Sequence, residues 1–340
     1  MRTGKLTNEQ LNDIVLSKLP ALSANTLVGA GIGADCAWCK VGENLMVTSS
    51  DPITAGGMQA GTLAVHVSCN DIAACGVKPT GILLVIIAPP SASENELRDI
   101  VDQASSESAR LGVDIVGGHT EVSDSVNTFV VITTAFGIVD KSHPVPLGKA
   151  RAGDKLILTK TCGIEGSYIA AKEHRHKLVG KVSEGLLDEA SSYDKLISVV
   201  TEGAAAGEMA SSDSSVNEHG FYNGAVSLMH DVTEGGVFGA AYEMAHFSQI
   251  GVRIDERLIP ITDATDAICK AMQINPYRLI SSGSLLIATS EPERVISAIE
   301  SHDIKATVVG EFIEKGYEYI DKEGHQLELT PPEADEVYSM

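Results

Sequence analysis

The chain has 340 residues, of which 44% are hydrophobic and 4% aromatic, and its formal net charge is −21. This length favours two domains, and the apolar fraction is too high for a disordered chain. The strong negative charge argues against nucleic acid and membranes as partners, because phosphate backbones and anionic lipids carry the same sign. A nucleotide remains compatible with such a surface, since metal ions or backbone amides neutralise phosphates locally.

The N-terminus and the cysteines indicate the compartment. Residues Met1 to Gln10 are polar and lack the apolar core of a signal peptide. The longest apolar run, Gly81 to Pro90, is too short to span a bilayer. Six cysteines in a chain of this length do not form a disulfide framework. We therefore expect a cytoplasmic protein.

The first half predicts strands alternating with helices. A capping-box pattern at Thr7 and Gln10 predicts an N-terminal helix. The later elements are a strand from Leu45 to Ser50 that ends at Asp51, a helix from Gln59 to Ala74, a strand from Ile82 to Ala88 covered on both faces, a helix from Ser93 to Leu111, a short strand from Val113 to Val116 and a longer one from Thr128 to Val139. This order predicts an α+β fold, an α/β sandwich whose strand ends deliver loops to one edge.

A stretch rich in proline, glycine and charge, Lys141 to Asp154, divides the chain into predicted domains at residues 1–150 and 151–340. The second half predicts strands at Lys155 to Lys160, Ala225 to Met229, Ser284 to Thr289 and Lys305 to Phe312, and helices at Tyr193 to Met209, Thr233 to Phe247 and Glu291 to Ser301. The polar segment from Ala210 to Gly224 is expected to be a mobile loop.

Four acidic motifs place a carboxylate where a predicted strand ends or a helix turns over. Their carboxylates are those of Asp35, Asp51, Asp71 and Asp231. A fifth motif, Gly117-Gly118-His119-Thr120-Glu121, has the same placement with a histidine and a glutamate as its polar groups. Carboxylates that converge from separate loops suit Mg²⁺. During phosphoryl transfer this ion binds carboxylate oxygens and the oxygens of nucleotide phosphates at the same time.

Each acidic motif taken alone is weak, because an aspartate after a strand is more often a turn former or a helix cap. Asp71 is harder to explain in that way. It lies inside an apolar helical stretch, where an unpaired carboxylate is costly. Asp51 ends a strand that is expected to be central. We therefore favour a functional role for both residues.

The order of the five motifs, together with the strand from Lys155 and the later Ser281-Ser282-Gly283-Ser284, resembles the superfamily of aminoimidazole ribonucleotide synthetase, the PurM-like proteins. That group includes selenophosphate synthetase, thiamine-monophosphate kinase and the hydrogenase maturation proteins of the HypE type. The resemblance runs from about Gly29 to about Gly310. His230-Asp231 with Thr233 and Gly235-Gly236 is most similar to the HypE branch.

The resemblance implies two α/β domains. It implies that the domain of residues 1–150 binds ATP and pairs with a second copy through its sheet, forming a homodimer, and that residues 151–340 complete the active-site cleft. It implies Mg²⁺ ligands at Asp35, Asp51, Asp71 and Asp231. It implies ATP contacts at Asp51, Asn70, Asp71, Gly117, Gly118, His119 and Thr120, and Gly117 to Thr120 match the family's glycine-rich nucleotide turn.

The resemblance also implies a reaction, in which ATP phosphorylates and so activates an acceptor oxygen. In the HypE branch, which serves hydrogenase maturation, the oxygen of a carboxamide is removed in this way and a nitrile is left. His119, Glu121 and Glu165 are the candidate catalytic residues. Two alternatives remain open: a small-molecule kinase resembling thiamine-monophosphate kinase, and a non-catalytic ATP-binding partner within a maturation complex.

Three positions depart from the family pattern. Ala34 stands where members often carry a second acid, and His119 stands where the HypE and kinase branches usually have an acid. HypE proteins end in a cysteine that carries the carboxamide, whereas this sequence ends in Glu336-Val337-Tyr338-Ser339-Met340. These departures motivate the non-catalytic alternative and an acceptor on a separate molecule.

Two further motifs are interpreted as structural. Cys36 and Cys39 form a C-x-x-C motif on a predicted strand, where residues three apart face opposite sides, so the two sulfurs do not converge. His66 lies in an apolar helix and is expected in the core or at an interface.

Overall fold

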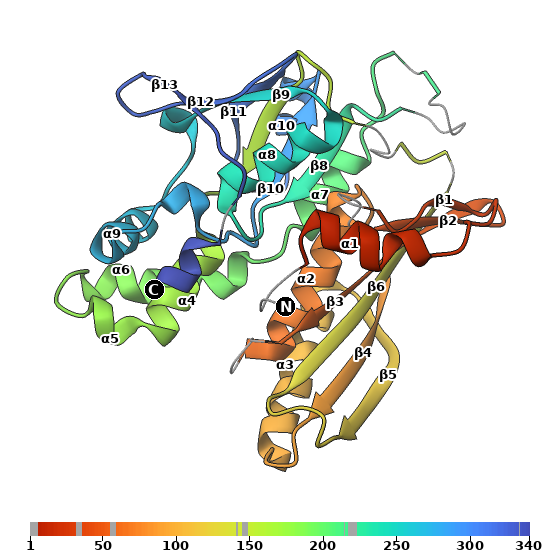
Figure 1. The fold of residues 1–340 in the computed structure, drawn as a ribbon, viewed down its shortest axis with the longest axis vertical. Helices are drawn as coiled ribbons and strands as arrows, with labels where there is room; N and C mark the ends of the chain where they lie inside the picture. Colours follow the sequence, from red (N-terminus) through yellow and green to blue (C-terminus); the bar gives the residue numbers. More distant parts are fainter. Residues whose placement is uncertain are drawn as a thin grey trace.

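The structure is a computed structural model that describes residues 6–31, 36–54, 59–140, 142–144, 149–213, 215–216, 223–332 and 334–340. It contains two β-sheets, one from each half of the chain, and helices pack on both. In Figure 1 the first half forms the lower lobe and the second half lies above and beside it. The predicted α+β fold class is confirmed.

The first sheet has six strands. Their order is β1 (Thr26–Val28), β2 (Ala37–Val41), β3 (Asn44–Ile53), β6 (Val130–Asp140), β4 (Gly81–Ala88) and β5 (Asp114–Val122). All neighbouring strands are antiparallel except β4 and β5, which are parallel. Helices α2 (Ala60–Ala74) and α3 (Glu94–Leu111) pack on this half, and α1 (Asn8–Ile14) precedes the sheet.

The helix ends of this half follow from local side chains. Thr7 with Gln10, and Ser93 with Glu96, form the predicted capping boxes, in which each side chain satisfies a backbone N–H at the start of the helix. Gly112 ends α3 in the left-handed conformation, with a φ of 67°. Both predicted helix starts are therefore confirmed, and the predicted bounds of α3 agree to within one residue.

In the single chain, the strand from Ile82 to Ala88 is covered on one face only, and not on both as expected. The helices cover one face, and the other carries exposed apolar side chains: Leu83 is 42% exposed, Val116 55% and Ile138 48%. The continuous apolar run therefore reflects one face in the core and one apolar face on the surface of the chain.

Two strands are longer than predicted. β3 continues through Asp51 to Ile53, so Asp51 lies within the strand, opposite Thr133 of β6. β5 continues through Gly117 and Gly118, which were predicted to form a turn. A Cβ atom built on Gly118 would lie 1.7 Å from the carbonyl oxygen of Leu84. The glycine thus allows β5 to pass close to β4, which is the physical reason for the correction.

Replacing Gly118 with alanine is expected to destabilise the protein by at least about 3 kcal/mol, because the added methyl group overlaps the backbone of β4. Gly117→Ala is the matched control. Its Cβ would approach only the Leu83 side chain, at 3.4 Å, and should change the free energy of unfolding by less than about 1 kcal/mol. Urea unfolding of both variants measures the difference, and equal stabilities would contradict this account of β5.

The second sheet has seven strands. Their order is β13 (Gln326–Glu328), β12 (Tyr317–Ile320), β9 (Gly251–Asp255), β11 (Ala306–Ile313), β7 (Lys155–Thr159), β10 (Leu285–Thr289) and β8 (Val226–Asp231). The predicted strands correspond to β7, β8, β10 and β11. The sequence did not predict β9, β12 and β13.

The helices of the second half are α4 (Ile164–Glu173), α5 (Arg175–Leu178), α6 (Glu184–Ala190), α7 (Val200–Gly207), α8 (Gly236–Ser248), α9 (Asp263–Met272) and α10 (Pro292–Glu300). Short 3₁₀ turns are η1 (Leu16–Lys18), η3 (Tyr193–Leu196), η4 (Glu256–Leu258), η5 (Pro276–Arg278) and η6 (Glu336–Ser339). The single helix predicted from Tyr193 to Met209 is therefore wrong, since it is divided into η3 and α7. Helices α4, α6 and α9 share an apolar cluster of their own.

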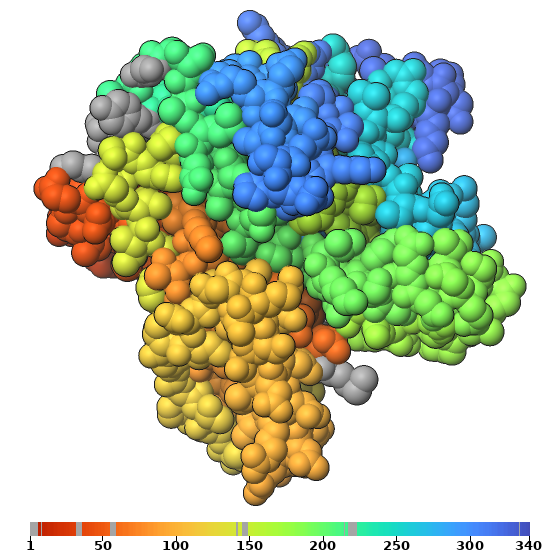
Figure 2. All heavy atoms as spheres, turned by 180° about the vertical axis from the view of Figure 1, so that it is seen from behind, coloured from red at the N-terminus to blue at the C-terminus, as the bar shows by residue number. Residues whose placement is uncertain are grey.

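The two halves share a core. One cluster of buried side chains joins Ile72 of α2 to Ile157, Val199 and Leu285 of the second half. In Figure 2, which views the molecule from behind, the α3–β5 lobe and the α4–α6 lobe project separately, and the surface is hollowed between them. The stretch from Lys141 to Asp154, which connects the two sheets, is only partly within the described residues, as is the loop predicted from Ala210 to Gly224.

Of the helices in the described ranges, none combines the length and the apolar character needed to cross a membrane.

Candidate functional site

A serine joins two of the predicted metal ligands. Ser49 Oγ, on β3, lies 2.6 Å from Asp71 Oδ2 of α2 and 3.2 Å from Asp51 Oδ2. Asp71 is 9% exposed and Ser49 8%. The strand and the helix therefore bring two carboxylates to one hydroxyl group at the edge of the core. Asp35, the third predicted ligand of this half, lies outside the described residues.

Two like charges so close together repel each other, and burial strengthens the repulsion. A divalent cation or a group rich in N–H donors offsets that repulsion. Carboxylate oxygens are the donors that Mg²⁺ prefers, so the chemistry of this pair fits the predicted ion.

Asn70, predicted to contact ATP, is fully buried, and its side chain binds backbone atoms. Its Nδ2 donates to the carbonyl oxygen of Ile197 at 2.9 Å, and its Oδ1 accepts from the N–H of Val199 at 2.9 Å. Both polar atoms of the amide thus hold the segment between η3 and α7 against α2. These contacts give Asn70 a positioning role beside Asp71, and they lie where the predicted helix is divided into η3 and α7.

Lys160 is a second positioning residue, and the sequence reasoning missed it. Its Nζ donates to the carbonyl oxygens of Ser198 and Gly283, each at 2.7 Å, and pairs with the carboxylate of Glu202. The Lys160 side chain is 14% exposed and that of Glu202 is 1% exposed. Burial is the main cause that lowers the pKa of Lys160, and Glu202 opposes it. Only a lone lysine after an apolar strand hinted at this buried pair.

The predicted glycine-rich turn does not lie beside Asp51 and Asp71. His119 and Glu121 project from β5, at the edge of the sheet, with 63% and 49% of their side chains exposed, and their Nε2 and Oε2 atoms lie 3.2 Å apart. In the sheet order, β6 and β4 separate β5 from β3, so the two sites are about 14 Å apart by the ordinary strand spacing. Gly117 to Thr120 form part of a strand and not a turn.

A second group of carboxylates lies in the other half. Asp231 ends β8 and is 3% exposed, and Glu165, in the first turn of α4, is 8% exposed. Burial, followed by the negative charges of Asp335 and Asp231, raises the pKa of Glu165 from 4.5 to about 7, although hydrogen bonds from Ser282 act in the opposite direction. Glu165 Oε2 is buried and has no hydrogen-bond partner.

Asp335 was also missed by the sequence reasoning. Its carboxylate accepts hydrogen bonds from the backbone N–H groups of Gly235, Val337 and Ile280, at 2.7, 2.8 and 3.2 Å. These contacts tie the segment after β8 to the C-terminal turn η6.

The raised pKa of Glu165 predicts a dependence of stability on pH. The folded protein holds this proton more tightly than the unfolded chain, so its contribution is favourable below about pH 4.5 and is lost as the pH rises toward 7. The loss amounts to about 3 kcal/mol. Glu165→Gln should therefore unfold at a higher temperature than the parent at pH 8 and at a similar temperature near pH 4.5.

Glu173→Gln, on the exposed side of α4, is the control and should show no such difference. Calorimetry at both pH values checks the prediction. A destabilised Glu165→Gln at pH 8 would contradict it.

The cysteines and His66 agree with their structural interpretation. Cys36 is 5% exposed and Cys39 is half-buried, and none of the six cysteines, all of which lie in the described ranges, forms a disulfide. His66 is fully buried, and its Nε2 lies 2.9 Å from Glu107 Oε2, which joins α2 to α3. Burial is the main cause that lowers the pKa of His66.

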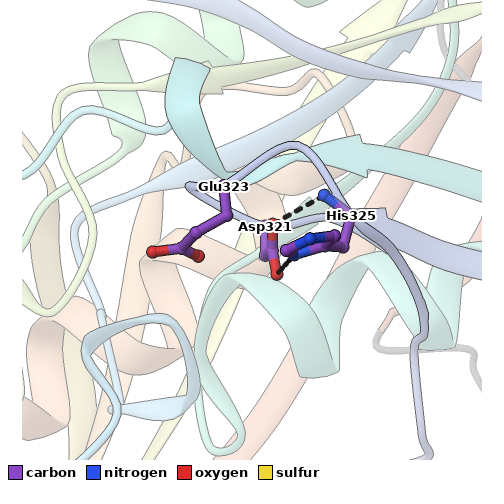
Figure 3. Close-up of side chains that lie close together, drawn as sticks. All are labelled: Asp321, Glu323 and His325. Atoms are coloured by element: carbon purple, nitrogen blue, oxygen red, sulfur yellow. Dashed lines mark hydrogen bonds and ion pairs between the residues drawn. The ribbon is translucent and has the colours of Figure 1, made fainter.

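Another potential ligand cluster lies on the β12–β13 hairpin, at the far edge of the second sheet (Figure 3). Asp321, Glu323 and His325 each have a ligand atom within 4.8 Å of the others. Asp321 accepts from the backbone N–H of His325 at 2.7 Å, and its other oxygen lies 3.0 Å from His325 Nδ1. These contacts close the hairpin turn, and the cluster is separate from both groups of buried carboxylates.

Two family profiles match most of the chain. The profile of "AIR synthase related protein, N-terminal domain" matches residues 33–139, and that of "AIR synthase related protein, C-terminal domain" matches residues 151–322. The chain is 27% identical to a putative hydrogenase expression/formation protein of Methanocaldococcus jannaschii, over 90% of this chain and 88% of that protein. It is 25% identical to the carbamoyl dehydratase HypE of Bradyrhizobium diazoefficiens, over 83% of this chain and 78% of the relative.

Solved structures share the fold. A HypE crystal structure in complex with ATP has a TM-score of 0.69 at 20% identity, covering 98% of this chain and 97% of the other. A thiamine monophosphate kinase from Aquifex aeolicus has a TM-score of 0.66 at 15% identity, with 96% and 100% covered. A HypE–HypF complex has a TM-score of 0.66 at 21% identity, with 87% and 93% covered.

Proposed function

Because this chain belongs to the family of AIR synthase related proteins, we propose that it is an ATP-dependent enzyme that phosphorylates the oxygen of a carboxamide. In this proposal the γ-phosphoryl group of ATP passes to the amide oxygen, releasing ADP. Loss of phosphate and a proton then leaves a nitrile. The names of the relatives, a carbamoyl dehydratase and a hydrogenase expression/formation protein, support this reaction and a role in hydrogenase maturation.

The observation that carries the proposal is the carboxylate pair held by Ser49. Asp51 and Asp71 would hold Mg²⁺ with the phosphates of ATP, and Asp35 is proposed to assist them. When bound, the ion neutralises charge on the phosphate oxygens. The remaining task falls to the chain itself, which must hold the acceptor in line with the phosphate and exclude water.

The two halves divide these tasks. We assign ATP binding and dimerisation to residues 1–150, and completion of the cleft to residues 151–340. Asn70 and Lys160 support this division, because both hold the segment from 197 to 199 at the contact of the two halves. His119, Thr120 and Glu121 line the outer strand, about 14 Å from Asp51 by strand spacing. An extended nucleotide is long enough to reach from one site to the other. Asp231 is proposed as a ligand that acts from the second half.

Isothermal titration of ATP with and without Mg²⁺, followed by product analysis with a carbamoylated thiol present, tests the proposal. Metal-dependent binding with release of ADP, phosphate and a thiocyanate supports the dehydratase. A stable phosphorylated product instead supports the small-molecule kinase, which the structural similarity to thiamine monophosphate kinase favours as second candidate. Binding without turnover indicates an ATP-binding partner, and absence of binding refutes all three.

The proposed homodimer would bury the exposed apolar face of the first sheet. Leu83, Val116 and Ile138 give that face its apolar character. Val116→Glu should shift the sedimentation coefficient from that of a dimer to that of a monomer, and an unchanged value would exclude this face.

A maturation protein is a further proposed partner, since one chain of a HypE–HypF complex has the same fold. We also propose a cytoplasmic location, which the lack of a disulfide among the described cysteines supports.

A further inference from the structure

Glu165 is not among the residues assigned to ATP, yet it is the buried acid in the described ranges that has a carboxyl oxygen without a hydrogen-bond partner. Its side chain is 8% exposed, and Oε2 is buried without a hydrogen-bond partner. A buried carboxyl oxygen without a donor costs free energy, whether or not the group is charged. A site that tolerates this cost in the free protein commonly recovers it by binding a ligand that supplies the donor.

The neighbours of Glu165 restrict what that ligand can be. Asp231 and Asp335 lie close enough for their negative charges to act on it. Asp335 is already engaged, because three backbone N–H groups donate to it. In the described ranges of the chain, Glu165 forms no ion pair with a lysine or arginine. An environment of this kind repels a phosphate or carboxylate and accepts a neutral or cationic group that carries N–H.

We infer that Glu165 determines acceptor specificity by accepting a hydrogen bond from the NH₂ group of a carboxamide or amidine. The inference rests on the proposed function and adds the orientation in which the acceptor binds. The nitrogen of the acceptor faces Glu165 and Ser282 in the second half, and the oxygen faces the phosphates held by the first. An acceptor whose reacting end is a phosphate, as in a phosphomonoester kinase, does not suit this side of the site.

A carboxyl oxygen at Glu165 distinguishes an acceptor that carries N–H from one that does not. An amide nitrogen that reaches a carboxyl oxygen satisfies both groups, whereas a dialkylated nitrogen leaves Oε2 as it is in the free protein. Hydrogen bonds to a charged or buried carboxyl group are among the stronger ones in proteins. We therefore expect at least about tenfold discrimination between the two kinds of acceptor.

S-carbamoyl-N-acetylcysteine is the probe, and its N,N-dimethyl counterpart is the comparison, since both present the same carbonyl oxygen. Binding of each to the ATP-free protein is measured by saturation-transfer NMR, and ATP turnover is measured in parallel. The parent protein should bind the dimethyl compound at least about tenfold more weakly. Glu165→Leu should lose that discrimination while its Kd for ATP stays within about twofold.

Glu165→Gln, which preserves volume and one oxygen, serves as a second variant if the leucine does not fold, and should retain part of the discrimination. Glu173→Gln on the same helix should behave as the parent. Equal binding of both probes by the parent overturns the inference. Discrimination that survives in Glu165→Leu also overturns it, because it would then arise from the bulk of the methyl groups.

The inference about Glu165 and the proposed function can be refuted independently of each other. If ATP is turned over with either probe and Glu165→Leu changes nothing, the inference is wrong and the proposed function stands. If ATP is neither bound nor turned over, but probe discrimination depends on Glu165, the proposed function is wrong and the N–H site stands.

Discussion

Replacing Asp71 with asparagine is expected to reduce metal-dependent ATP turnover by at least about 100-fold. Asparagine keeps the size of the side chain and can still bond with Ser49, which lies 2.6 Å from the carboxylate. It removes the negative charge, however, and an amide is a poor ligand for Mg²⁺ compared with a carboxylate. The loss should therefore appear in catalysis and metal dependence, and not in folding.

ADP release as a function of Mg²⁺ concentration measures this effect. Asp102→Asn, at an exposed position of α3, is the matched control and should turn over ATP at the parent rate. Thermal unfolding of Asp71→Asn should show no loss of stability, since the change relieves repulsion with Asp51. Unchanged turnover in Asp71→Asn would remove the β3–α2 pair from the ATP site.

Replacing Lys160 with methionine is expected to lower the free energy of unfolding by about 3–5 kcal/mol. The methionine leaves Glu202, whose side chain is 1% exposed, as an unpaired buried charge. It also removes the donor for the carbonyl oxygens of Ser198 and Gly283. Three losses at one position in the core make this the largest stability effect that we expect from a single side chain.

Urea unfolding compares Lys160→Met with Lys155→Met, which breaks the surface pair with Glu311. Both partners of that pair are more than a third exposed, at 43% and 34%, so its loss should cost less than about 1 kcal/mol. The double variant Lys160→Met, Glu202→Leu should recover much of the stability, because no charge is then left unpaired. If the two single variants lost similar free energies of unfolding, the buried pair would contribute no more to stability than the surface pair.

Much of the first half could be predicted because its signals are local. Capping boxes at Thr7 and Ser93, and Gly112 after α3, act within one helical turn, so neighbouring letters in the sequence suffice to recognise them. The errors in this half have a different origin. The strand β5 continues through Gly117 and Gly118, where the carbonyl oxygen of Leu84 leaves no space for a Cβ atom at Gly118, and that contact is not visible in the local sequence.

The helices α4, α5, α6 and α9 were missed because they are short and bury one another. Ile164, Leu187 and Ile268 meet in one cluster, although they lie in three separate helices of ten residues or fewer. In so few turns an apolar stripe gives little periodicity, and packing among the helices supplies their stability instead. The sequence therefore indicated the strands of the second half better than its helices.

The candidate site was predictable where function requires an unusual residue in an apolar setting. Asp71 stood out for that reason, and the structure brings it to Asp51 through Ser49. Lys160 and Asp335 did not stand out, because each binds a backbone atom that is distant in sequence, at Gly283 and Gly235, which are 123 and 100 positions away. Every residue carries the same backbone groups, so the sequence does not show which of them a side chain binds. Such contacts can be recognised only in the fold.

Asp335 has a practical consequence for anyone who prepares this protein. The C-terminal turn supplies the acceptor for the N–H groups of Gly235 and Ile280, which precede α8 and β10. Trimming the chain ahead of Asp335, as is often done to help crystals grow, would loosen the loop that follows Asp231. The carbonyl oxygen of Met340, at the end of the same turn, accepts a hydrogen bond from Lys177 at 2.6 Å. A spacer between Met340 and any fused handle would leave both contacts intact.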